Sequence, residues 1–420
     1  MAVWTTPRSS ASSRGCRAVP IGDLVLVAPD KFRGSVSARE AAASLGRGIR
    51  RTAPFAMVVE RPIADGGEGT VDALCAAGFA RVELTDTVGS RRDGRRPSVA
   101  VRGRVAVIEL AELCGLELTP DDERDALRAT SRPVGEAIRE VLDLGFRHIV
   151  LAVGGSASTD GGAGMMRALG LRILDQDRQP VPEGTEYLRD ARSIDVSEVD
   201  SRIHEAYVLL AADVSNPLLG SDGAAAVFAP QKGADPETVA LLESGLRAWA
   251  AAVGGPYATA PGAGAAGGVG FAALALLGAE RRSGFQLVSE FVGLPELLPQ
   301  ARLVVTGEGK LDIQTLSGKA PAGVASTAAR HGVPVVIATG YSELDGRAGS
   351  AAGFSAIYAL ADREPNPIIS MRDAPALLER IGGDIARDYL PGLTTSQPMN
   401  LHTGPMTRPT PTASERTEPK

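Results

Sequence analysis

The stretch Val153-Gly-Gly-Ser-Ala-Ser-Thr-Asp-Gly-Gly-Ala-Gly164 decides how we interpret the fold of this chain. An apolar run over residues 148–153 leads into it, and the pattern of residues 163–169 predicts a helix that leads out. A buried strand that ends in a glycine-rich turn and opens a helix brings backbone N–H groups close to a phosphate, because glycine has no side chain to block the approach. The sequence therefore predicts a phosphate-binding loop, and a tight turn with a helix cap is the alternative.

The polar residues of this loop favour a binding function over a simple turn. Hydroxyl donors from three side chains, Ser156, Ser158 and Thr159, lie between two glycine pairs of the stretch, Gly154-Gly155 and Gly161-Gly162. Asp160 is the exception, because a carboxylate repels a bare phosphate. Its presence fits a loop in which it holds a magnesium ion or takes a proton from a hydroxyl group.

Composition narrows the class of protein. With 420 residues the chain exceeds the size of one typical core, which predicts two domains. The net charge of -6 offers no electrostatic basis for binding nucleic acid or an anionic membrane surface. No apolar run approaches the roughly 20 residues that a membrane span needs. We therefore expect neither a nucleic acid nor a membrane as a partner.

The cysteines and the two ends of the chain predict a protein of the cytoplasm. Cys16, Cys75 and Cys114 lie far apart and lack metal-ligand spacing, which is typical of a reducing compartment. Residues 1–20 are rich in Ser and Arg and lack the apolar segment of a secretory signal, so we expect a disordered extension. Residues 392–420 are rich in Thr, Pro and Ser and predict a disordered tail.

The first predicted strand, residues 24–28, is followed by a basic loop. Lys31, Arg33 and Ser35 come after this strand, and Ser37 with Glu40 predicts a capping box that opens the next helix. The carboxyl ends of strands are where open α/β sheets bind ligands. The loop is therefore a candidate site for an anionic substrate, and solvated surface charge is the alternative.

A second predicted strand, residues 56–60, leads into Asp65-Gly-Gly-Glu68. Two carboxylates beside Gly66 and Gly67 in one turn suggest a metal site or a pair that orients a hydroxyl group. The alternative is a pair of acids that the dipole of the following helix favours.

The middle of the chain differs from its flanks. Residues 99–108 predict an antiparallel hairpin that turns at Arg102-Gly103, unlike the strand–helix units on either side. A helix is expected from Pro133 to Gly145. A further buried strand over residues 207–211 places Asp213 and Asn216 at its carboxyl end. We interpret this region as an inserted domain.

Other glycine-rich segments exclude two nucleotide-binding classes. Gly262-Ala-Gly-Ala-Ala-Gly267 matches the dinucleotide fingerprint formally, but no convincing strand precedes it, so we reject a dehydrogenase. A strand over 302–306 precedes Gly307-Glu-Gly-Lys-Leu-Asp312, and Lys319 follows. Neither a Walker A motif nor the protein-kinase signature set is present.

The predicted strands give an α/β fold in two lobes. Five strands, near residues 24, 56, 302, 333 and 356, fit a flavodoxin-like parallel α/β domain. This domain would comprise residues 21–62 and 286–391, interrupted by an inserted mixed α/β domain over residues 63–285. We expect the active site in the cleft between the two lobes, where most of the glycine-rich loops would gather.

Several of these motifs resemble the bacterial glycerate kinase family of the glyoxylate and glucarate pathways. The resemblance spans residues 22 to 390 and rests on these segments, in order: Ala28-Pro-Asp-Lys-Phe-Arg-Gly-Ser35, Ala64-Asp-Gly-Gly-Glu-Gly-Thr70, Gly154 to Gly164, Asp213-Val-Ser-Asn-Pro-Leu218, Gly223 to Gly233, Gly264-Ala-Ala-Gly-Gly268 and Thr306-Gly-Glu-Gly-Lys-Leu-Asp312. Ser158-Thr159 and Thr339-Gly340 depart from the family pattern and put substrate detail in question.

The resemblance implies ATP-dependent phosphorylation of D-glycerate with Mg²⁺. It favours 2-phosphoglycerate as the product, with 3-phosphoglycerate as the alternative. It also implies a two-lobed α/β fold, in agreement with the strand pattern. ATP and D-glycerate are then the expected small-molecule partners, and a homodimer stays an open alternative.

The resemblance also assigns roles to individual residues. Backbone N–H groups of 154–162 would cradle the ATP phosphates, Lys310 or Lys319 beside Gly307 would neutralise developing charge, and Asp160 or Glu308 would hold Mg²⁺. Asp213, or alternatively Asp65, would orient or deprotonate the attacking hydroxyl group. The substrate would contact the following residues: Lys31, Arg33, Ser35, Gly66, Gly67 and Asn216.

One alternative from a different class remains. A catalytically silent nucleotide or sugar-acid sensor on the same fold would have lost an acid or a lysine from these motifs. The motifs retain their charged residues: Asp65, Glu68, Asp160, Asp213, Glu308, Lys310 and Asp312. The sequence therefore favours the kinase.

Overall fold

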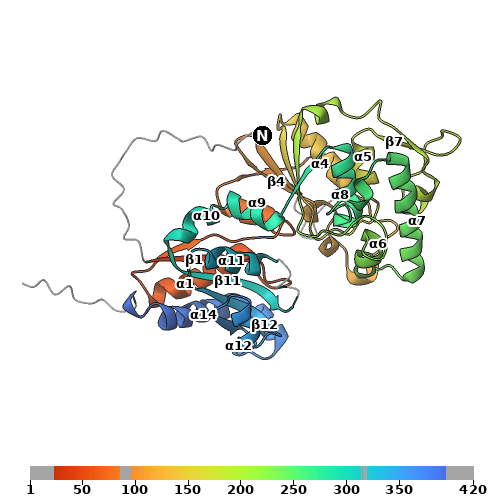
Figure 1. Ribbon diagram of the computed structural model, residues 1–420. Helices are drawn as coiled ribbons and strands as arrows, with labels where there is room; N and C mark the ends of the chain where they lie inside the picture. The colour runs from red at the N-terminus through yellow and green to blue at the C-terminus, as the bar shows by residue number, and fades with distance from the viewer. Residues whose placement is uncertain (1–22, 86–95, 314, 316–318, 394–420) are drawn as a thin grey trace, which may run out of the picture.

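A computed structural model describes residues 23–85, 96–313, 315 and 319–393 of the chain. The predicted disordered extension at 1–20, Cys16 and residues 394–420 of the predicted tail lie outside the described residues. Two sheets organise the rest, one in each of two lobes (Figure 1).

The first sheet confirms the predicted flavodoxin-like arrangement. Its strands are β1 (Leu24–Pro29), β2 (Met57–Glu60), β11 (Ala301–Leu311), β12 (Val335–Ser342) and β13 (Ala356–Ala359). They lie in the order β2-β1-β11-β12-β13 and are all parallel. This is the strand order of doubly wound sheets with one switch point next to the first strand. β11 is longer than predicted and reaches Leu311, so Glu308 and Lys310 lie within a strand, where a loop was expected.

Both faces of this sheet are covered by helices. Val25 and Val27 of β1 face α1 (Ala38–Thr52) and α14 (Ala374–Tyr389), whereas Leu24 and Leu26 join the cluster that includes α11 (Ala320–Ala329). Alternating side chains on a strand point to opposite faces, so a strand with both faces covered is apolar throughout, as β1 is. The predicted cap is present, since the Glu40 N–H donates to the Ser37 hydroxyl at 3.2 Å.

The second sheet is mixed, as we predicted for the inserted domain. Its strands are β3 (Ala80–Glu83), β4 (Ser98–Arg102), β5 (Val105–Glu109), β6 (His148–Ala152), β9 (Tyr207–Ala211) and β10 (Glu280–Arg282). The order is β10-β9-β6-β5-β4-β3. The β4–β5 hairpin is antiparallel as predicted, and β5, β6, β9 and β10 are parallel. The short ribbon β7 (Arg172–Leu174) with β8 (Ser193–Asp195) was not predicted.

One face of the second sheet is buried in an apolar cluster to which four helices contribute: α4 (Arg132–Asp143), α5 (Ala163–Ala168), α7 (Pro236–Val253) and α8 (Val269–Leu276). The predicted apolar stripe of α7 is core, with Trp249 and Phe271 fully buried in contact with each other. The remaining helices are α2 (Thr70–Ala76), α3 (Ala111–Cys114), α6 (Ala224–Phe228), α9 (Gly284–Phe291), α10 (Leu294–Leu297), α12 (Gly346–Ala351) and α13 (Pro367–Arg372).

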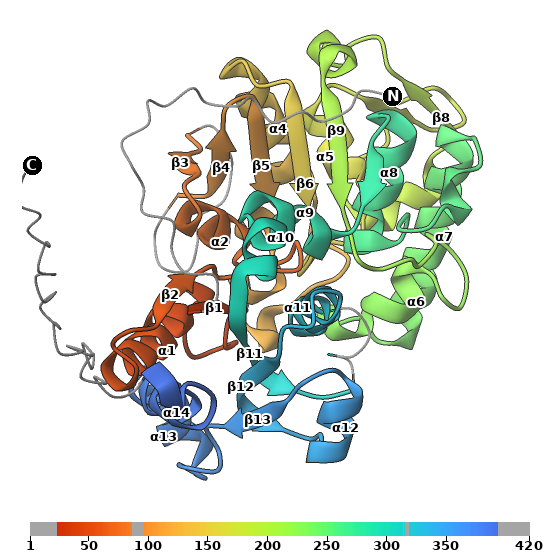
Figure 2. The same cartoon turned by 60° about the vertical axis from the view of Figure 1, so that its left-hand side comes forward.

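An apolar cluster joins the two lobes. It contains Leu26 and Val304 of the first sheet, Val107 of the second, and Leu74 of α2 with Phe285 of α9. Figure 2 shows α9 and α10 between the two sheets. The strands of the first sheet come from residues 24–60 and 301–359, and those of the second from residues 80–282. The domain boundaries at 62/63 and 285/286 stay a prediction. None of the helices in the described ranges is long and apolar enough to cross a membrane.

Candidate active site

A cavity of about 280 Å³ lies where loops of both lobes meet. Val153 to Ser156 at the carboxyl end of β6 and Ala211 to Val214 at that of β9 form part of its wall. The other lining residues are Arg33, Asp65, Leu116, Phe228, Gln231, Lys232, Ala265, Ala266 and Gly267. The carboxyl ends of parallel strands are the usual place for a ligand in an α/β sheet, so this cavity is the candidate site.

Two glycine-rich loops cross at the cavity by backbone contact. The Gly154 N–H donates to the carbonyl oxygen of Gly66 at 3.0 Å. A Cβ on Gly154 would lie 2.6 Å from Cα of Gly67, closer than any side chain tolerates. Glycine is therefore required at this position for one loop to pass the other. The crossing also occupies the Gly154 N–H, which cannot then reach a phosphate.

We call residues 153–164 the organising loop. Its second half packs into the lobe of the second sheet and does not face the cavity. A Cβ on Gly161 would lie 2.5 Å from Cδ1 of Trp249, whose indole N–H donates to the Gly161 carbonyl at 2.9 Å. Gly162 has φ +73° and fits closely against Ala272 of α8. The Gly161 and Gly162 N–H groups are used within the protein, by Gly267 and Asp160 respectively.

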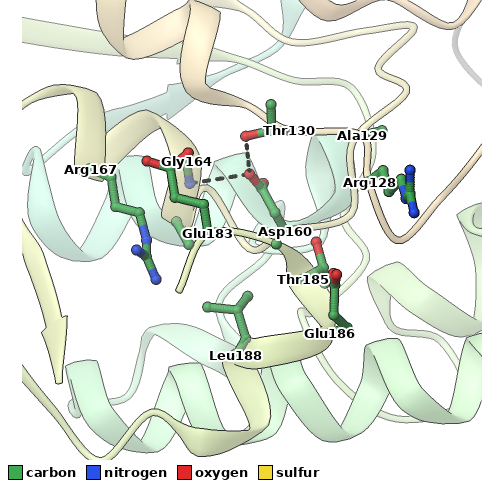
Figure 3. Close-up of a pocket in the computed structure, with 12 residues that line it drawn as sticks. Arg128, Ala129, Thr130, Asp160, Gly164, Arg167, Glu183, Thr185, Glu186 and Leu188 are labelled. Carbon is green, nitrogen blue, oxygen red and sulfur yellow. Dashed lines mark hydrogen bonds between the residues drawn. The ribbon is translucent and has the colours of Figure 1, made fainter. Parts of the chain in front are cut away.

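Asp160 is a structural anchor in its present geometry. Its Oδ2 accepts from the Ser131 N–H and hydroxyl at 2.8 Å each and from the Gly164 N–H at 3.1 Å, with the Thr130 hydroxyl at 3.4 Å. The Oδ1 accepts from Gly162 at 3.0 Å. Asp160 borders a different cavity, of about 220 Å³, that shares no lining residue with the candidate site (Figure 3). With four donors on Oδ2 and one on Oδ1, Asp160 has a poor arrangement for a metal ligand.

Only part of the predicted phosphate loop can meet a ligand. Ser158 and Thr159 are fully buried and do not border the cavity, so their hydroxyl groups are not available there. The N–H groups of Gly155 and Ser156 border the cavity and donate to no group among the described residues. The first half of the loop therefore retains the features of a phosphate cradle, and the second half does not.

Four acids from both lobes act on one another near the cavity. Burial, and after it the carboxylate of Asp65, raise the pKa of Asp30 to about 8. Burial likewise raises the pKa of Glu308 to about 7, with Asp65 again contributing. Asp65, which lines the cavity, is the common neighbour, because it also raises the pKa of Asp213. Glu308 Oε1 is buried and accepts no hydrogen bond from the described residues.

Asp213 and Asp65, the two candidate bases, differ in how their oxygens are used. In Asp213, Oδ1 accepts from the Ser283 hydroxyl at 2.6 Å and Oδ2 from the Phe285 N–H at 3.1 Å, at the start of α9. Burial is the main cause that raises the pKa of Asp213. In Asp65, Oδ1 accepts from the Gly67 N–H at 3.1 Å. Asp65 therefore keeps more accepting capacity toward the cavity.

The predicted substrate-binding residues separate into three settings. Arg33 borders the cavity and is mostly exposed, with Nε 3.5 Å from Oε1 of Glu117. Lys31 Nζ lies 2.8 Å from both the carbonyl and the Oε2 of Glu68, and so joins the two strand-end loops. Ser35 donates to the Met371 carbonyl at 2.6 Å, outside the cavity.

Other predicted residues have local partners away from the cavity. Lys310 is exposed and pairs with Glu343 at 2.8 Å, and Lys319 lies 3.9 Å from Asp312 at the start of α11. The Asn216 side chain donates to the Asp222 carbonyl at 2.8 Å and closes a turn. Gly307 lies inside β11 against the Phe32 ring.

Three residues of the site region were not assigned a role from the sequence. Asp30 lies in the segment Ala28 to Ser35 and Lys232 in the segment Gly223 to Gly233, so these motifs were the available signal. Glu109, at the end of β5, accepts from the Gly69 and Val71 N–H groups at 2.9 and 2.8 Å and thereby caps α2. Burial raises the pKa of Glu109 to about 8. Nothing in its local sequence signals this role.

The sequence predicted that segment 262–267 is not a dinucleotide-binding loop, because no strand precedes it. It follows a short 3-10 turn over 257–259, where a dinucleotide fold would have a strand. Ala265, Ala266 and Gly267 border the cavity, and Ala266 has φ +52°, an unusual value for a residue with a side chain. Backbone strain of this kind gathers at functional sites.

A preformed metal site is absent from the described part of the chain, where no three His, Cys, Asp or Glu side chains are grouped to hold an ion. The donor set still suits magnesium, because Mg²⁺ commonly uses one or two carboxylates and takes its other ligands from water and substrate phosphates. Asp65 and Glu308, with the unpartnered Glu308 oxygen, provide such carboxylates.

Comparisons with known proteins agree with this arrangement. Residues 25–390 match the sequence profile of the glycerate kinase family. A glycerate kinase of Bacillus subtilis (strain 168) is 39% identical over 368 residues, which are 86% of this chain and 96% of that protein. The glycerate 2-kinase of Escherichia coli (strain K12) is 40% identical over 319 residues, 74% of this chain and 84% of that protein.

A solved structure shares the fold. A crystal structure from Salmonella typhimurium LT2, whose protein carries the provisional name glycerate kinase 2, has a TM-score of 0.74 and 36% identity. The match covers 89% of this chain and all of that one, at 100%. The profile match, the curated relatives and the shared fold cover the same two lobes, and the chain belongs to the glycerate kinase family.

Proposed function

We propose that this chain transfers the γ-phosphoryl group of ATP to the 2-hydroxyl group of D-glycerate in the cavity between the lobes. One observation carries the assignment of the site. Asp65, Asp213, Arg33 and the unused N–H groups of Gly155 and Ser156 border the same cavity, although they come from distant parts of the sequence. Phosphoryl transfer needs this combination of anion-binding donors and a carboxylate near the attacking hydroxyl.

The reaction would rely on positioning and charge. The oxygen at C2 of D-glycerate attacks the γ-phosphorus, the bond to the β–γ bridging oxygen breaks, and ADP leaves. Asp65 accepts the hydroxyl proton, because it lines the cavity and its oxygens are less occupied than those of Asp213. The Gly155 and Ser156 N–H groups donate to phosphate oxygens, and Arg33 provides positive charge for the substrate carboxylate.

Magnesium supplies charge neutralisation for the phosphates when it is bound. Glu308, which has an unpartnered buried oxygen, would hold it, with Asp30 as a nearby acid and Asp65 left free to accept the proton. The raised pKa values of Glu308 and Asp30 support this proposal, because acids that repel one another are stabilised as anions by a shared cation. Asp160 is not part of the proposed metal site.

The name of the E. coli relative, glycerate 2-kinase, supports the 2-position. Phosphorus NMR of the purified chain with D-glycerate, ATP and Mg²⁺ tests this. We expect a phosphomonoester signal split by one proton, as in 2-phosphoglycerate. Splitting by two protons would assign 3-phosphoglycerate. Unchanged ATP and glycerate with folded protein would favour the silent sensor instead.

The cytoplasm stays the proposed location. Its support is that Cys75 and Cys114 are free thiols, which persist in a reducing compartment. Fractionation of cells that express the tagged chain tests it.

The homodimer stays a prediction, which sedimentation of the purified chain would test.

A further inference from the structure

Lys232 is a buried ammonium group at the edge of the candidate site. It lies in the 3-10 turn 230–232, after α6, and is 2% exposed. Its Nζ donates to the Ser158 carbonyl at 2.5 Å and to the Ser156 hydroxyl at 3.0 Å. Lys232 therefore contacts the organising loop, and it also borders the cavity that Ser156 lines.

The charge of Lys232 has no direct carboxylate partner. Among the described residues, both hydrogen-bond partners of Nζ are neutral oxygens, and Cys114 and Asp160 are the titratable groups that act on it. On its other side, a cavity of about 210 Å³ has both signs of charge in its wall: Glu123, Arg124, Asp125 and Arg128. Burial lowers the pKa of Lys232 to about 8.

A buried cation held only by neutral oxygens is costly unless it meets an anion. The two bonds to Ser156 and Ser158 could be made by a neutral donor without the desolvation that an ammonium group suffers. An ammonium group carries three donors, and these bonds use two of them. Lys232 lines the same cavity as Gly155 and Ser156, whose N–H groups are also unused among the described residues.

We propose that Lys232 binds an anionic oxygen of a substrate in this cavity, together with the Gly155 and Ser156 N–H groups. The inference rests on the proposed function for the identity of the ligands, since ATP and D-glycerate both bring such oxygens. A phosphate of ATP and the carboxylate of glycerate share the required chemistry, and binding measurements with each ligand alone distinguish them.

The test compares Lys232→Met, which removes the charge, with Lys232→Arg, which keeps it. Arg247→Met is the matched control, because Arg247 is an exposed cation that pairs with Glu243 on α7. Isothermal titration with ATP and Mg²⁺, and separately with D-glycerate, gives the affinity of each variant. We expect Lys232→Met to lower the affinity for one of the two ligands at least tenfold. Lys232→Arg should lower this affinity less, and Arg247→Met should have the affinities of the wild type.

Affinities of Lys232→Met within twofold of wild type for both ligands would overturn the inference and leave Lys232 as a brace for the loop. If Lys232→Met does not fold, the wild type and Lys232→Arg suffice. Wild-type affinity should fall between pH 7 and pH 9 as Lys232 loses its proton, and the arginine variant should resist this fall. Equal pH dependence in the two proteins would also overturn it.

Failure of the proposed function gives a different result. If the wild type forms no phosphoglycerate but the Lys232→Met variant binds ATP more weakly than the wild type, the kinase is refuted and the anion site is retained. If the wild type forms phosphoglycerate and the Lys232→Met variant keeps wild-type affinities for both substrates, the kinase is retained and the anion site is refuted.

Discussion

The Gly154 N–H donates to the carbonyl oxygen of Gly66 at 3.0 Å, so that two glycine-rich loops more than 80 residues apart in sequence meet backbone to backbone. This crossing fixes the loop that carries Asp65 against the loop that carries Gly155 and Ser156. The acid proposed as the base and the N–H groups proposed to bind phosphate are thereby held at one cavity.

We expect Gly154→Ala to damage both stability and activity. Its Cβ would lie 2.6 Å from Cα and 3.0 Å from N of Gly67, so one loop must move. Overpacking of this kind costs about 1–3 kcal/mol in the free energy of unfolding, and we expect kcat/KM to fall at least tenfold as Asp65 shifts. Urea unfolding and steady-state assays measure the two effects. Gly346→Ala is the control, because a Cβ there meets open space. Wild-type values for Gly154→Ala would show that the crossing is not rigid.

The two candidate bases can be separated by matched substitutions. We expect Asp65→Asn to lower kcat by about 10²-fold or more with little change in Tm, because it removes the proton acceptor. Asp213→Asn should lower Tm and reduce kcat less, because the Asp213 carboxylate holds Ser283 and the Phe285 N–H at the start of α9. A larger loss of kcat in Asp213→Asn than in Asp65→Asn would transfer the base to Asp213.

The acids near the cavity predict that stability falls as the pH rises. The pKa values of Asp30 and Glu308 are about 8 and 7 in the folded protein, above their ordinary values of 3.8 and 4.5. The folded state therefore binds more protons than the unfolded state between about pH 4 and pH 8. The contribution of these acids is fully present below this interval and is lost as the pH rises through it.

Urea unfolding at pH 5, 6.5 and 8 in EDTA measures this dependence. Asp30→Asn stays neutral and should give a shallower fall, although Glu109, with a pKa also raised to about 8, retains part of it. Mg²⁺ with ADP should stabilise the wild type more at pH 8 than at pH 5, since the acids must ionise to hold the ion. A pH dependence that Asp30→Asn leaves unaltered would exclude Asp30 as a contributor.

Lys31 and Lys310 form a matched pair for testing which lysine belongs to the site. Each lies 2.8 Å from a glutamate oxygen, but Lys31 is 21% exposed and joins two loops at the cavity, whereas Lys310 is 54% exposed on β11. We expect Lys31→Met to lower kcat/KM at least tenfold and Lys310→Met to stay within about threefold of wild type, because exposed ion pairs contribute little. The reverse ranking in steady-state assays would restore Lys310 as the residue that neutralises charge.

The sequence alone determined the strands of the first sheet and the central strands of the second, but not the β7–β8 ribbon. Apolar runs bounded by glycine and proline predicted β1, β6, β9 and β12, because a strand covered on both faces must be apolar throughout, and short runs predicted the edge strands β2 and β13. The hairpin at Arg102-Gly103 and the cap at Ser37 followed from turn and cap chemistry, which depends on neighbouring residues only. The motifs also predicted the family, since they extend in order along the chain.

Only the tertiary structure decided which polar groups are available to a ligand. Glycines look alike in sequence, yet Gly155 faces the cavity while Gly161 packs on Trp249. Asp160 and Asp65 sit in similar glycine-rich turns, but five donors from the loop and the start of α4 saturate Asp160. Lys232 became a candidate for binding a substrate anion because the structure shows it buried at the cavity. Hydrogen bonding and desolvation depend on residues distant in sequence, and for that reason the pattern along the chain could not predict them.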